Sequence, residues 1–158
     1  MLSGPIKTLE SIQRKLKADS AEQGREVKIE ELKDIVRCSF IFETREQIEV
    51  ALQQLHSLMN IVRAKNRTKN AGYKDVLLNV QYEGVIVEVQ LHTAAGLAAK
   101  DGDMIPHASV QAQNAKLGSL AGNGHRLYDL ERTAKGVHKG ILSALSVAFY
   151  EMCEVLTL

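Results

Sequence analysis

The sequence is poor in the residues that several large classes of protein need. Tryptophan is absent, aromatic residues make up 4% of the chain, and there are two cysteines and two prolines in 158 residues. Two cysteines cannot build the disulfide framework of a small secreted domain, so Cys38 and Cys153 are expected to be reduced thiols of a cytoplasmic protein. With so few aromatic rings, a platform that stacks single-stranded bases would depend on one or two side chains.

The chain also lacks an excess of charge. Twenty Lys and Arg residues against nineteen Asp and Glu residues give a net charge of +1. This near-neutral balance gives no support for duplex DNA or a membrane surface as a partner, although it is compatible with a local basic patch. No uninterrupted apolar run reaches the roughly 18 residues of a membrane span. Because 45% of the residues are hydrophobic, we expect one folded domain over residues 1–158.

The hydrophobic pattern predicts an α+β fold with a mixed β-sheet flanked by helices. Residues 94–123 are expected to be helical in pieces, and residues 67–75 are expected to be a loop. Residues 19–30 are expected to be either a loop or a frayed second piece of helix. A further turn or two of helix is expected over 125–133. The clearest elements are helices over 6–18 and 45–59 and strands over 32–42 and 61–66. Residues 137–156 are expected to form a long helix whose apolar positions face the core: Val137, Ile141, Leu145, Ala148, Phe149, Met152 and Val155.

An antiparallel hairpin is the strongest local prediction. The segments VLLNVQY and VIVEVQLHT flank Glu83-Gly84, and an acidic-Gly pair between two strand patterns is typical of a two-residue turn. This turn pairs Tyr82 with Val85 and places Asn79 opposite Glu88. One face is then apolar and faces the core: Val76, Leu78, Val80, Tyr82, Val85, Val87, Val89 and Leu91. The other face holds Asp75, Leu77, Asn79, Gln81, Ile86, Glu88, Gln90 and His92.

The polar face of this hairpin has two interpretations. It could be an ordinary solvated sheet face. However, its side chains are acids, amides and an imidazole, and the preceding predicted strand contains Asp34 near its start. Two carboxylates on adjacent strands with lysines nearby would suit a site for Mg²⁺ and a nucleotide, because carboxylate oxygens hold the cation and lysines neutralise phosphate.

Four short motifs together resemble the RelA/SpoT-type alarmone synthetase domain, which has a nucleotidyltransferase-like fold. The first is Lys7…Ser11…Lys15 on the first helix, and the second is the strand that follows Asp34. The third is Lys69 with Gly72-Tyr73, and the fourth is Glu88-Val-Gln-Leu-His-Thr93. The motifs lie in residues 7–93, and residues 94–158 would form a C-terminal helical part of the same domain.

The sequence departs from the family pattern mainly at substrate contacts. Pro5 stands where the family has Arg, Ala71 where it has Asn, and Leu77 where it has His. The second motif also differs, with Arg37 at a position for a small residue and Ser39 at a position for Arg. These departures leave the acceptor substrate open.

The resemblance implies transfer of the β,γ-pyrophosphate of ATP to a ribose 3′-hydroxyl. Asp34 and Glu88 would be catalytic and would hold Mg²⁺, and Glu88 would also take the hydroxyl proton. Tyr73 would stack on the acceptor base. The full set of implied nucleotide-binding residues is Lys7, Ser11, Lys15, Lys69, Tyr73, Lys74, Asn79, Gln90 and His92. Each also has a purely structural interpretation, such as a solvated lysine or a hydrogen-bonded amide of the sheet.

Two functions from different classes therefore remain open. The chain could be a pyrophosphokinase that acts on GDP or GTP, on another nucleotide or on an RNA 3′ end. It could instead be a catalytically inactive module of the same fold that binds a nucleotide or a protein partner. The sequence could also be a domain of a larger protein. It contains neither a Walker motif nor a Rossmann glycine motif, and its histidines lack the spacing of a zinc site.

Overall fold

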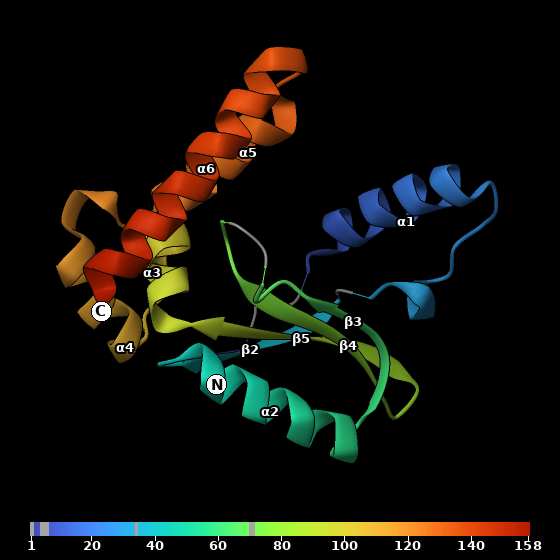
Figure 1. Cartoon of the computed structure of the whole chain (residues 1–158). Helices are drawn as coiled ribbons and strands as arrows, with labels where there is room; N and C mark the ends of the chain where they lie inside the picture. Colours follow the sequence, from blue (N-terminus) through green and yellow to red (C-terminus); the bar gives the residue numbers. More distant parts are fainter. Residues whose placement is uncertain (1, 4–6, 34, 70–71) are drawn as a thin grey trace. The chain divides into compact units, whose positions relative to one another are not determined.

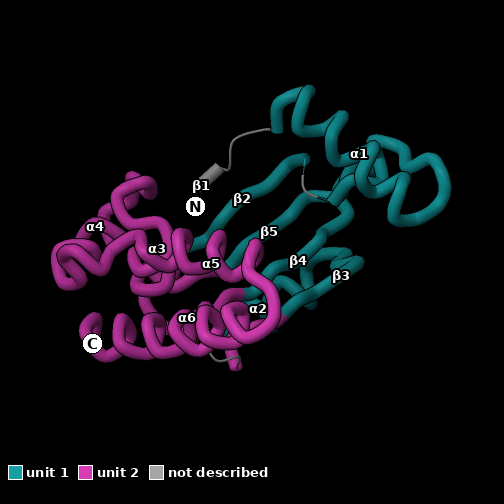
Figure 2. Tube along the Cα trace, turned by 90° about the horizontal axis from the view of Figure 1, so that it is seen from above, with its two compact units in different colours: residues 1–41, 49–65, 76–91 teal, residues 42–48, 66–75, 92–158 magenta. Residues whose placement is uncertain are grey.

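The computed structural model describes residues 2–3, 7–33, 35–69 and 72–158 (Figure 1). The chain forms two compact units, and the chain passes between them several times (Figure 2). Unit 1 comprises residues 1–41, 49–65 and 76–91, and unit 2 comprises residues 42–48, 66–75 and 92–158.

A five-stranded sheet forms the centre of unit 1. Its spatial order is β1-β2-β5-β4-β3. The strands are β1 (Leu2–Ser3), β2 (Val36–Phe42), β3 (Asn60–Asn66), β4 (Asp75–Tyr82) and β5 (Val85–Thr93). β1 pairs antiparallel with β2. The mixed sheet with an antiparallel hairpin confirms the predicted fold class.

The predicted hairpin turn has the expected backbone. Glu83 and Gly84 have φ angles of 47° and 80°, and two successive positive φ values are typical of the type I′ turn that joins twisted strands. The predicted position of the strand after Asp34 beside this hairpin is also confirmed, because β2 neighbours β5. β2 begins at Val36 rather than at residue 32, because Leu32 is buried with Ile12 and Val27 in a separate small core.

Unit 1 has a helix on each face of its sheet (Figure 1). α1 (Leu9–Gln23) lies over one face and most of α2 (Arg45–Leu58) over the other, and the short 3₁₀ helix η1 (Ile29–Glu31) follows α1. α2 agrees with the predicted helix at 45–59. α1 continues past residue 18 as far as Gln23, so the first part of 19–30 is helical, which was one of the two alternatives for this segment. Gly24, with a φ of 64°, is the left-handed C-cap.

The predicted apolar face of the hairpin is confirmed except near the turn. Val80 and Val89 are buried, at 4% and 5% exposed, whereas Tyr82 and Val85 beside the turn are 62% and 48% exposed, so these two do not face the core as predicted. The interpretation of the opposite face as solvated is wrong for the polar side chains at its centre. Asn79 is 1% exposed because α1 and the segment after it cover this face.

Unit 2 is mainly helical. Its helices are α3 (Ala94–Asp101), η2 (Gly102–Met104), α4 (Ala108–Leu117), η3 (Gly118–Leu120), α5 (Asn123–Thr133) and α6 (Gly136–Thr157). This series confirms the predicted helical pieces between residues 94 and 123. A close approach fixes α5 against its neighbours, because a Cβ atom on Gly124 would lie 2.2 Å from the hydroxyl oxygen of Tyr150.

α6 differs from the other helices in length and apolarity. Its 22 residues are long and apolar enough to cross a membrane by length and composition, which the sequence analysis did not anticipate. However, Phe149, Tyr150 and Cys153 on one of its sides are buried. The prediction that the apolar positions of this helix face the core is therefore wrong for most of them, since Ile141, Leu145 and Met152 are 54%, 52% and 45% exposed.

Candidate active site

A polar cleft of about 510 Å³ lies in unit 1, on the sheet face that α1 covers. Three segments supply its walls: α1 with the loop after it, the end of β3, and the middle of the hairpin. Its lining residues are Lys15, Asp19, Glu22, Gln23, Val27, Glu31, Lys33, Arg63, Lys65, Leu77, Asn79 and Glu88. The sequence predicted Lys15, Asn79 and Glu88 as site residues, and the structure brings these three together.

The floor of the cleft is a set of hydrogen-bonded side chains. The Asn79 side chain donates from Nδ2 to the carbonyl oxygen of Lys33 at 3.0 Å. Gln90 donates from Nε2 to Oε1 of Glu88 at 2.7 Å, and the Oε1 of Gln90 accepts from the hydroxyl of Ser39 at 3.4 Å. Asn79 and Glu88, which the predicted register places opposite each other, therefore bond to separate partners.

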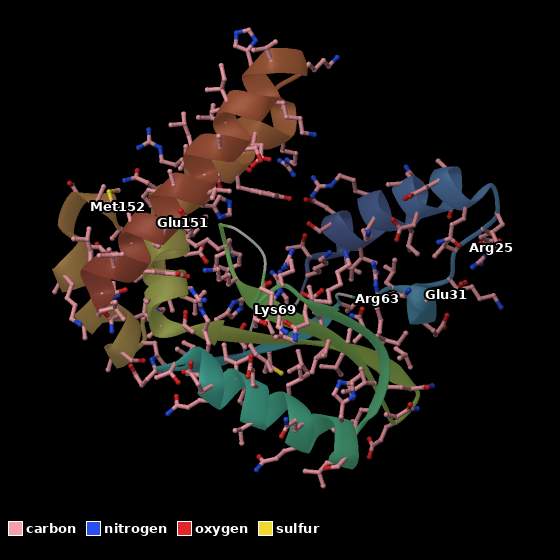
Figure 3. The ribbon with its side chains drawn as sticks, viewed as in Figure 1. Arg25, Glu31, Arg63, Lys69, Glu151 and Met152 are labelled. Atoms are coloured by element: carbon pink, nitrogen blue, oxygen red, sulfur yellow. The ribbon has the colours of Figure 1, made fainter. Side chains whose placement is uncertain are left out.

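The acidic side chains of the cleft differ in their ion pairs. Lys15 bonds Asp19 at 3.0 Å, one helical turn away. Arg25 bonds Glu31 through two guanidinium nitrogens, at 3.1 and 2.6 Å (Figure 3). The hydrogen bond from Arg25 lowers the pKa of the exposed Glu31 carboxyl to about 2. Asp19 and Glu31 are thus paired with Lys15 and Arg25, whereas Glu88 accepts a hydrogen bond from the neutral Gln90 amide.

Arg63 and Lys65 are cleft residues that the sequence analysis did not identify. Both lie on β3, two residues apart, so their side chains leave the same face of the sheet. Both are exposed, and Figure 3 shows Arg63 on this strand. The signal in the sequence was the Arg-x-Lys alternation of residues 61–66, which could be assigned to a face only once β3 was known to neighbour β4.

Other residues that the family resemblance singled out either do not line the cleft or are not among the residues that the structure describes. Lys7 is half-buried and is not among the described residues that line the cleft. The backbone N–H of Ser11 donates to the Thr8 hydroxyl at 3.3 Å, which caps α1. Asp34, Pro5 and Ala71 lie outside the described residues. Their roles stay predictions.

The predicted base-stacking residue, Tyr73, has close neighbours within unit 2. Its hydroxyl lies 2.7 Å from Nδ1 of His92, its ring centroid is 5.4 Å from that of Tyr150, and the Lys100 ammonium is 5.2 Å from its centroid. Burial lowers the pKa of His92 to about 4, so the imidazole is neutral at pH 7. We therefore assign the Tyr73 hydroxyl as donor and Nδ1 as acceptor.

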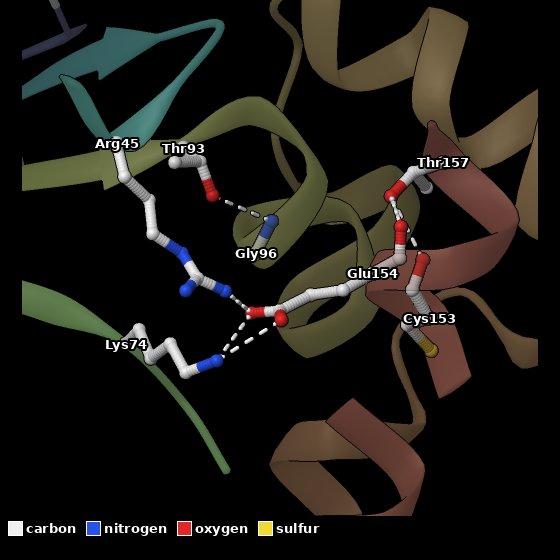
Figure 4. A network of polar contacts seen from close by, with 7 residues as sticks. All are labelled: Arg45, Lys74, Thr93, Gly96, Cys153, Glu154 and Thr157. Carbon is white, nitrogen blue, oxygen red and sulfur yellow. Dashed lines mark hydrogen bonds and ion pairs between the residues drawn. The ribbon is translucent and has the colours of Figure 1, made fainter. Parts of the chain in front are cut away.

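Lys74, predicted to contact acceptor phosphates, is engaged in an ion-pair network of unit 2 (Figure 4). Its ammonium bonds both carboxylate oxygens of Glu154, at 3.1 and 3.0 Å, and the guanidinium of Arg45 bonds the same carboxylate. The Lys74 side chain is 17% exposed. A phosphate that bound Lys74 would have to compete with Glu154. Lys69, by contrast, is exposed.

A second ion pair in unit 2 holds the start of β4. Arg67 donates from Nε and from one terminal nitrogen to the two carboxylate oxygens of Asp75, both at 2.6 Å. The backbone N–H of Arg67 also donates to the carbonyl oxygen of Asp75 at 2.9 Å. Asp75 is 3% exposed, so this bidentate pair compensates a buried charge. The sequence analysis placed Asp75 on the polar face but missed its partner.

Comparison with solved structures identifies the fold. The chain superposes on the type VI effector Tas1, solved in complex with its immunity protein, with a TM-score of 0.78 and 21% identity over 97% of this chain and 80% of that chain. It also matches smu.1046c from Streptococcus mutans, with a TM-score of 0.58 and 17% identity over 97% of this chain and 73% of that chain. The small alarmone synthetase 1 of Bacillus subtilis gives a TM-score of 0.51 and 20% identity over 96% of this chain and 74% of that chain.

The chain has a RelA/SpoT-like fold. No protein-family model matches the chain, and a search of curated proteins finds no match. The fold resemblance predicted from four short motifs is thus confirmed by structure, at an identity that leaves substrate and activity to be tested.

Proposed function

We propose that the cleft of unit 1 binds ATP and that the protein transfers its β,γ-pyrophosphate to the 3′-hydroxyl of an acceptor nucleotide. One observation carries the proposal: on a RelA/SpoT-like fold, the cleft combines Glu88 with the cationic side chains of Lys15, Lys33, Arg63 and Lys65. Cations of this kind neutralise a triphosphate, and a carboxylate beside them can accept the proton of an attacking hydroxyl.

The reaction needs positioning and charge stabilisation more than covalent chemistry. The acceptor 3′-oxygen forms a bond to the β-phosphorus, the bond from that phosphorus to the α,β-bridging oxygen breaks, and AMP leaves. The hydroxyl proton passes to the Glu88 carboxylate. Arg63 and Lys65 would offset the negative charge that gathers on the phosphoryl oxygens, as fixed cations do in phosphoryl transfer.

The donor set of the cleft fits a magnesium ion bound together with the nucleotide. Within the described part of the chain, no three acidic, histidine or cysteine side chains gather as a metal site. Mg²⁺ in nucleotide enzymes is held through one or two carboxylates, water and the substrate phosphates, so it needs no such cluster. Glu88 would hold it, with Asp34 as the second predicted carboxylate, and the ion would supply Lewis-acid stabilisation of the phosphates.

The acceptor contacts proposed here are those that the family resemblance implies. Tyr73 would stack on its base, and Lys69 would contact its phosphates, with Lys74 available after release from Glu154. Lys7, Ser11, Gln90 and His92 are the further proposed nucleotide-binding residues. GDP and GTP are the acceptors that the family resemblance implies, and another nucleotide or an RNA 3′ end is equally compatible with the substitutions at Ala71 and Leu77.

A specific observation favours the second candidate function, a nucleotide- or partner-binding module without catalysis. Both Tyr73 and Lys74, proposed as acceptor contacts, already have partners inside unit 2, namely His92 and Glu154. If these contacts persist when ATP binds, the acceptor lacks two of its proposed contacts.

The experiment that separates the two functions is incubation with ATP, Mg²⁺ and a panel of GDP, GTP, ADP and tRNA, followed by mass spectrometry. Pyrophosphate transfer releases AMP and increases the acceptor mass by one diphosphate. Glu88→Gln should abolish the product, whereas Glu22→Gln, a change of another cleft carboxylate, should retain it. ATP binding without AMP release from any acceptor would support the binding module and contradict the enzyme.

A further inference from the structure

Three side chains on one face of the sheet form a row of hydrogen bonds that ends at Glu88. The hydroxyl of Ser39 donates to Oε1 of Gln90 at 3.4 Å, and Nε2 of Gln90 donates to Oε1 of Glu88 at 2.7 Å. Glu88 and Gln90 are two residues apart on β5, so their side chains leave the same face of the sheet. Ser39 reaches this face from β2, the neighbour of β5 in the sheet.

Only one orientation of the Gln90 amide suits both of its neighbours in this row. An ionised carboxylate has no hydrogen to donate, so the amide group that faces Glu88 must be the NH₂ group. The amide oxygen then faces Ser39, whose hydroxyl can donate to it. If the amide were reversed, its oxygen would face the Glu88 carboxylate, and two acceptors would repel each other. Ser39 therefore favours the orientation in which Gln90 is a donor to Glu88.

The Gln90 amide holds Glu88 without neutralising its charge. A short hydrogen bond at one carboxylate oxygen restricts rotation of the carboxylate group, and the amide itself is uncharged. Two other carboxylates of the cleft, Asp19 and Glu31, are paired with cations instead. Within the described part of the chain, no hydrogen bond is made to Oε2 of Glu88. This second oxygen is therefore the one placed to accept a proton.

Gln90 lies behind the surface of the cleft. Glu88 is one of the residues that line the cleft, whereas Gln90 and Ser39 are not among the described lining residues. All three are partly buried, and a hydrogen bond in such a place competes with less water than one at the surface. The family resemblance assigns Gln90 to the nucleotide, but the structure shows that it donates to the carboxylate of Glu88.

We propose that Gln90 is a positioning residue of the transfer reaction: it directs the Glu88 carboxylate toward the acceptor hydroxyl, and Ser39 keeps the Gln90 amide in the orientation that does so. The proposal rests on the proposed function, because it assigns a partner to the base of that reaction. A general base must lie within hydrogen-bond reach of the proton it accepts, and a small misplacement of a reacting group costs a large part of the rate. Ser39 is one of the departures from the family pattern, so the resemblance does not supply this arrangement.

Steady-state kinetics of AMP release test the positioning role, with the acceptor that the wild type uses. Gln90→Met, which keeps the length of the side chain but removes the donor, should lower kcat at least about tenfold and leave KM for ATP within about twofold. Gln81→Met is the matched control, because Gln81 is an exposed amide of the neighbouring strand β4 and should keep the wild-type kcat. Circular dichroism establishes that both variants fold. A higher KM with an unchanged kcat would make Gln90 a substrate contact and overturn the proposal.

Two changes of Ser39 test the orientation of the amide. Ser39→Ala should lower kcat about threefold to tenfold, which is the loss expected for a single neutral hydrogen bond. Ser39→Thr should restore kcat, because threonine keeps the hydroxyl and suits a strand. An unchanged kcat in Ser39→Ala, or a loss that Ser39→Thr does not restore, contradicts the role of Ser39.

Nuclear magnetic resonance tests the same contacts without turnover. The side-chain amide signals of Gln90, identified by their loss in Gln90→Met, should shift in Glu88→Gln and in Ser39→Ala but not in Gln81→Met. Signals that respond to neither of the first two changes would overturn the row of hydrogen bonds. A wild type that releases no AMP with any acceptor contradicts the proposed function itself, whereas an active wild type with an equally active Gln90→Met variant contradicts only the positioning role.

Discussion

The side chain of Asn79 holds the backbone of Lys33. Asn79 lies on β4 and is 1% exposed, and its Nδ2 donates to the Lys33 carbonyl oxygen at 3.0 Å. Lys33 precedes Asp34 in the sequence and lines the same cleft as Glu88. A buried amide on the sheet thereby ties down the segment that leads into β2, where the family resemblance predicts the second carboxylate.

Replacement of Asn79 by Leu should destabilise the protein by about 1–3 kcal/mol, because the Lys33 carbonyl loses the hydrogen bond from a side chain that is itself buried. Urea denaturation measures the change. Gln81→Leu is the control, since Gln81 is an exposed amide on the same strand and should change stability by less than about 0.5 kcal/mol. Equal effects in the two variants would show that the Asn79 contact does not stabilise the fold.

Arg63→Ala and Lys65→Ala should each weaken binding of Mg²⁺–ATP about tenfold, or about 1.4 kcal/mol, while the melting temperature stays nearly constant. Both side chains are exposed on β3, so their loss leaves no buried group without a partner. Titration calorimetry at two salt concentrations measures the affinity for Mg²⁺–ATP. The loss of affinity in each variant should be smaller at high salt, because salt screens exposed charges. Lys17→Ala, an exposed lysine of α1 that is not among the lining residues, should bind like the wild type.

Stability should depend on the protonation of His92. Its pKa in the folded protein is about 4, lowered by burial from an ordinary value of 6.5. The unfolded chain therefore binds the proton more tightly, so stability is constant above about pH 6.5 and falls as the pH approaches 4, by up to about 3 kcal/mol. Urea unfolding at pH 7, 6 and 5 measures this slope.

His92→Gln should reduce the pH slope, because the amide can still accept the Tyr73 hydroxyl but does not titrate. Tyr73→Phe provides the complementary control. It removes the 2.7 Å hydrogen bond to His92 and leaves the imidazole. This variant should therefore be less stable at pH 7, and its stability should still fall as the pH is lowered. An unchanged slope in His92→Gln would assign the acid sensitivity to other groups.

Arg67→Met should cost about 2–4 kcal/mol, because it leaves the Asp75 carboxylate buried without its cation. Because the Arg67 side chain is 41% exposed, we expect the loss of stability to lie in the lower part of this range. The double variant Arg67→Met/Asp75→Leu should be more stable than Arg67→Met alone, since it removes the buried charge as well. A double-mutant cycle from urea curves measures the coupling, and strictly additive losses would contradict it.

The parts of this fold that were predicted correctly are those that local sequence determines. The Glu83-Gly84 turn fixed the hairpin because its two positions require positive φ, and the valine alternation then identified the apolar face. The helix at 45–59 followed from its apolar periodicity. The four motifs identified the fold because they fall on these elements in the order of the family.

The parts that were missed depend on contacts between distant residues. Arg63 and Lys65 became cleft residues only through the pairing order of the sheet, in which β3 lies beside β4. Burial of Asn79 depends on how α1 covers the polar face, which amphipathicity alone does not specify. Glu154 lies 80 residues from Lys74, and no local pattern indicates such a pair.

The contacts of Glu154 also determine the order in which the protein can fold. This carboxylate of α6 joins Lys74 and Arg45, which lie 80 and 109 residues earlier in the chain. Closing loops of this length costs conformational entropy before any contact compensates for it. During synthesis the ribosome completes every segment of unit 1 before it reaches α6, so unit 1 can fold early. Arg45 and Lys74, in the unit 2 segments 42–48 and 66–75, can pair with Glu154 only after α6 has been synthesised.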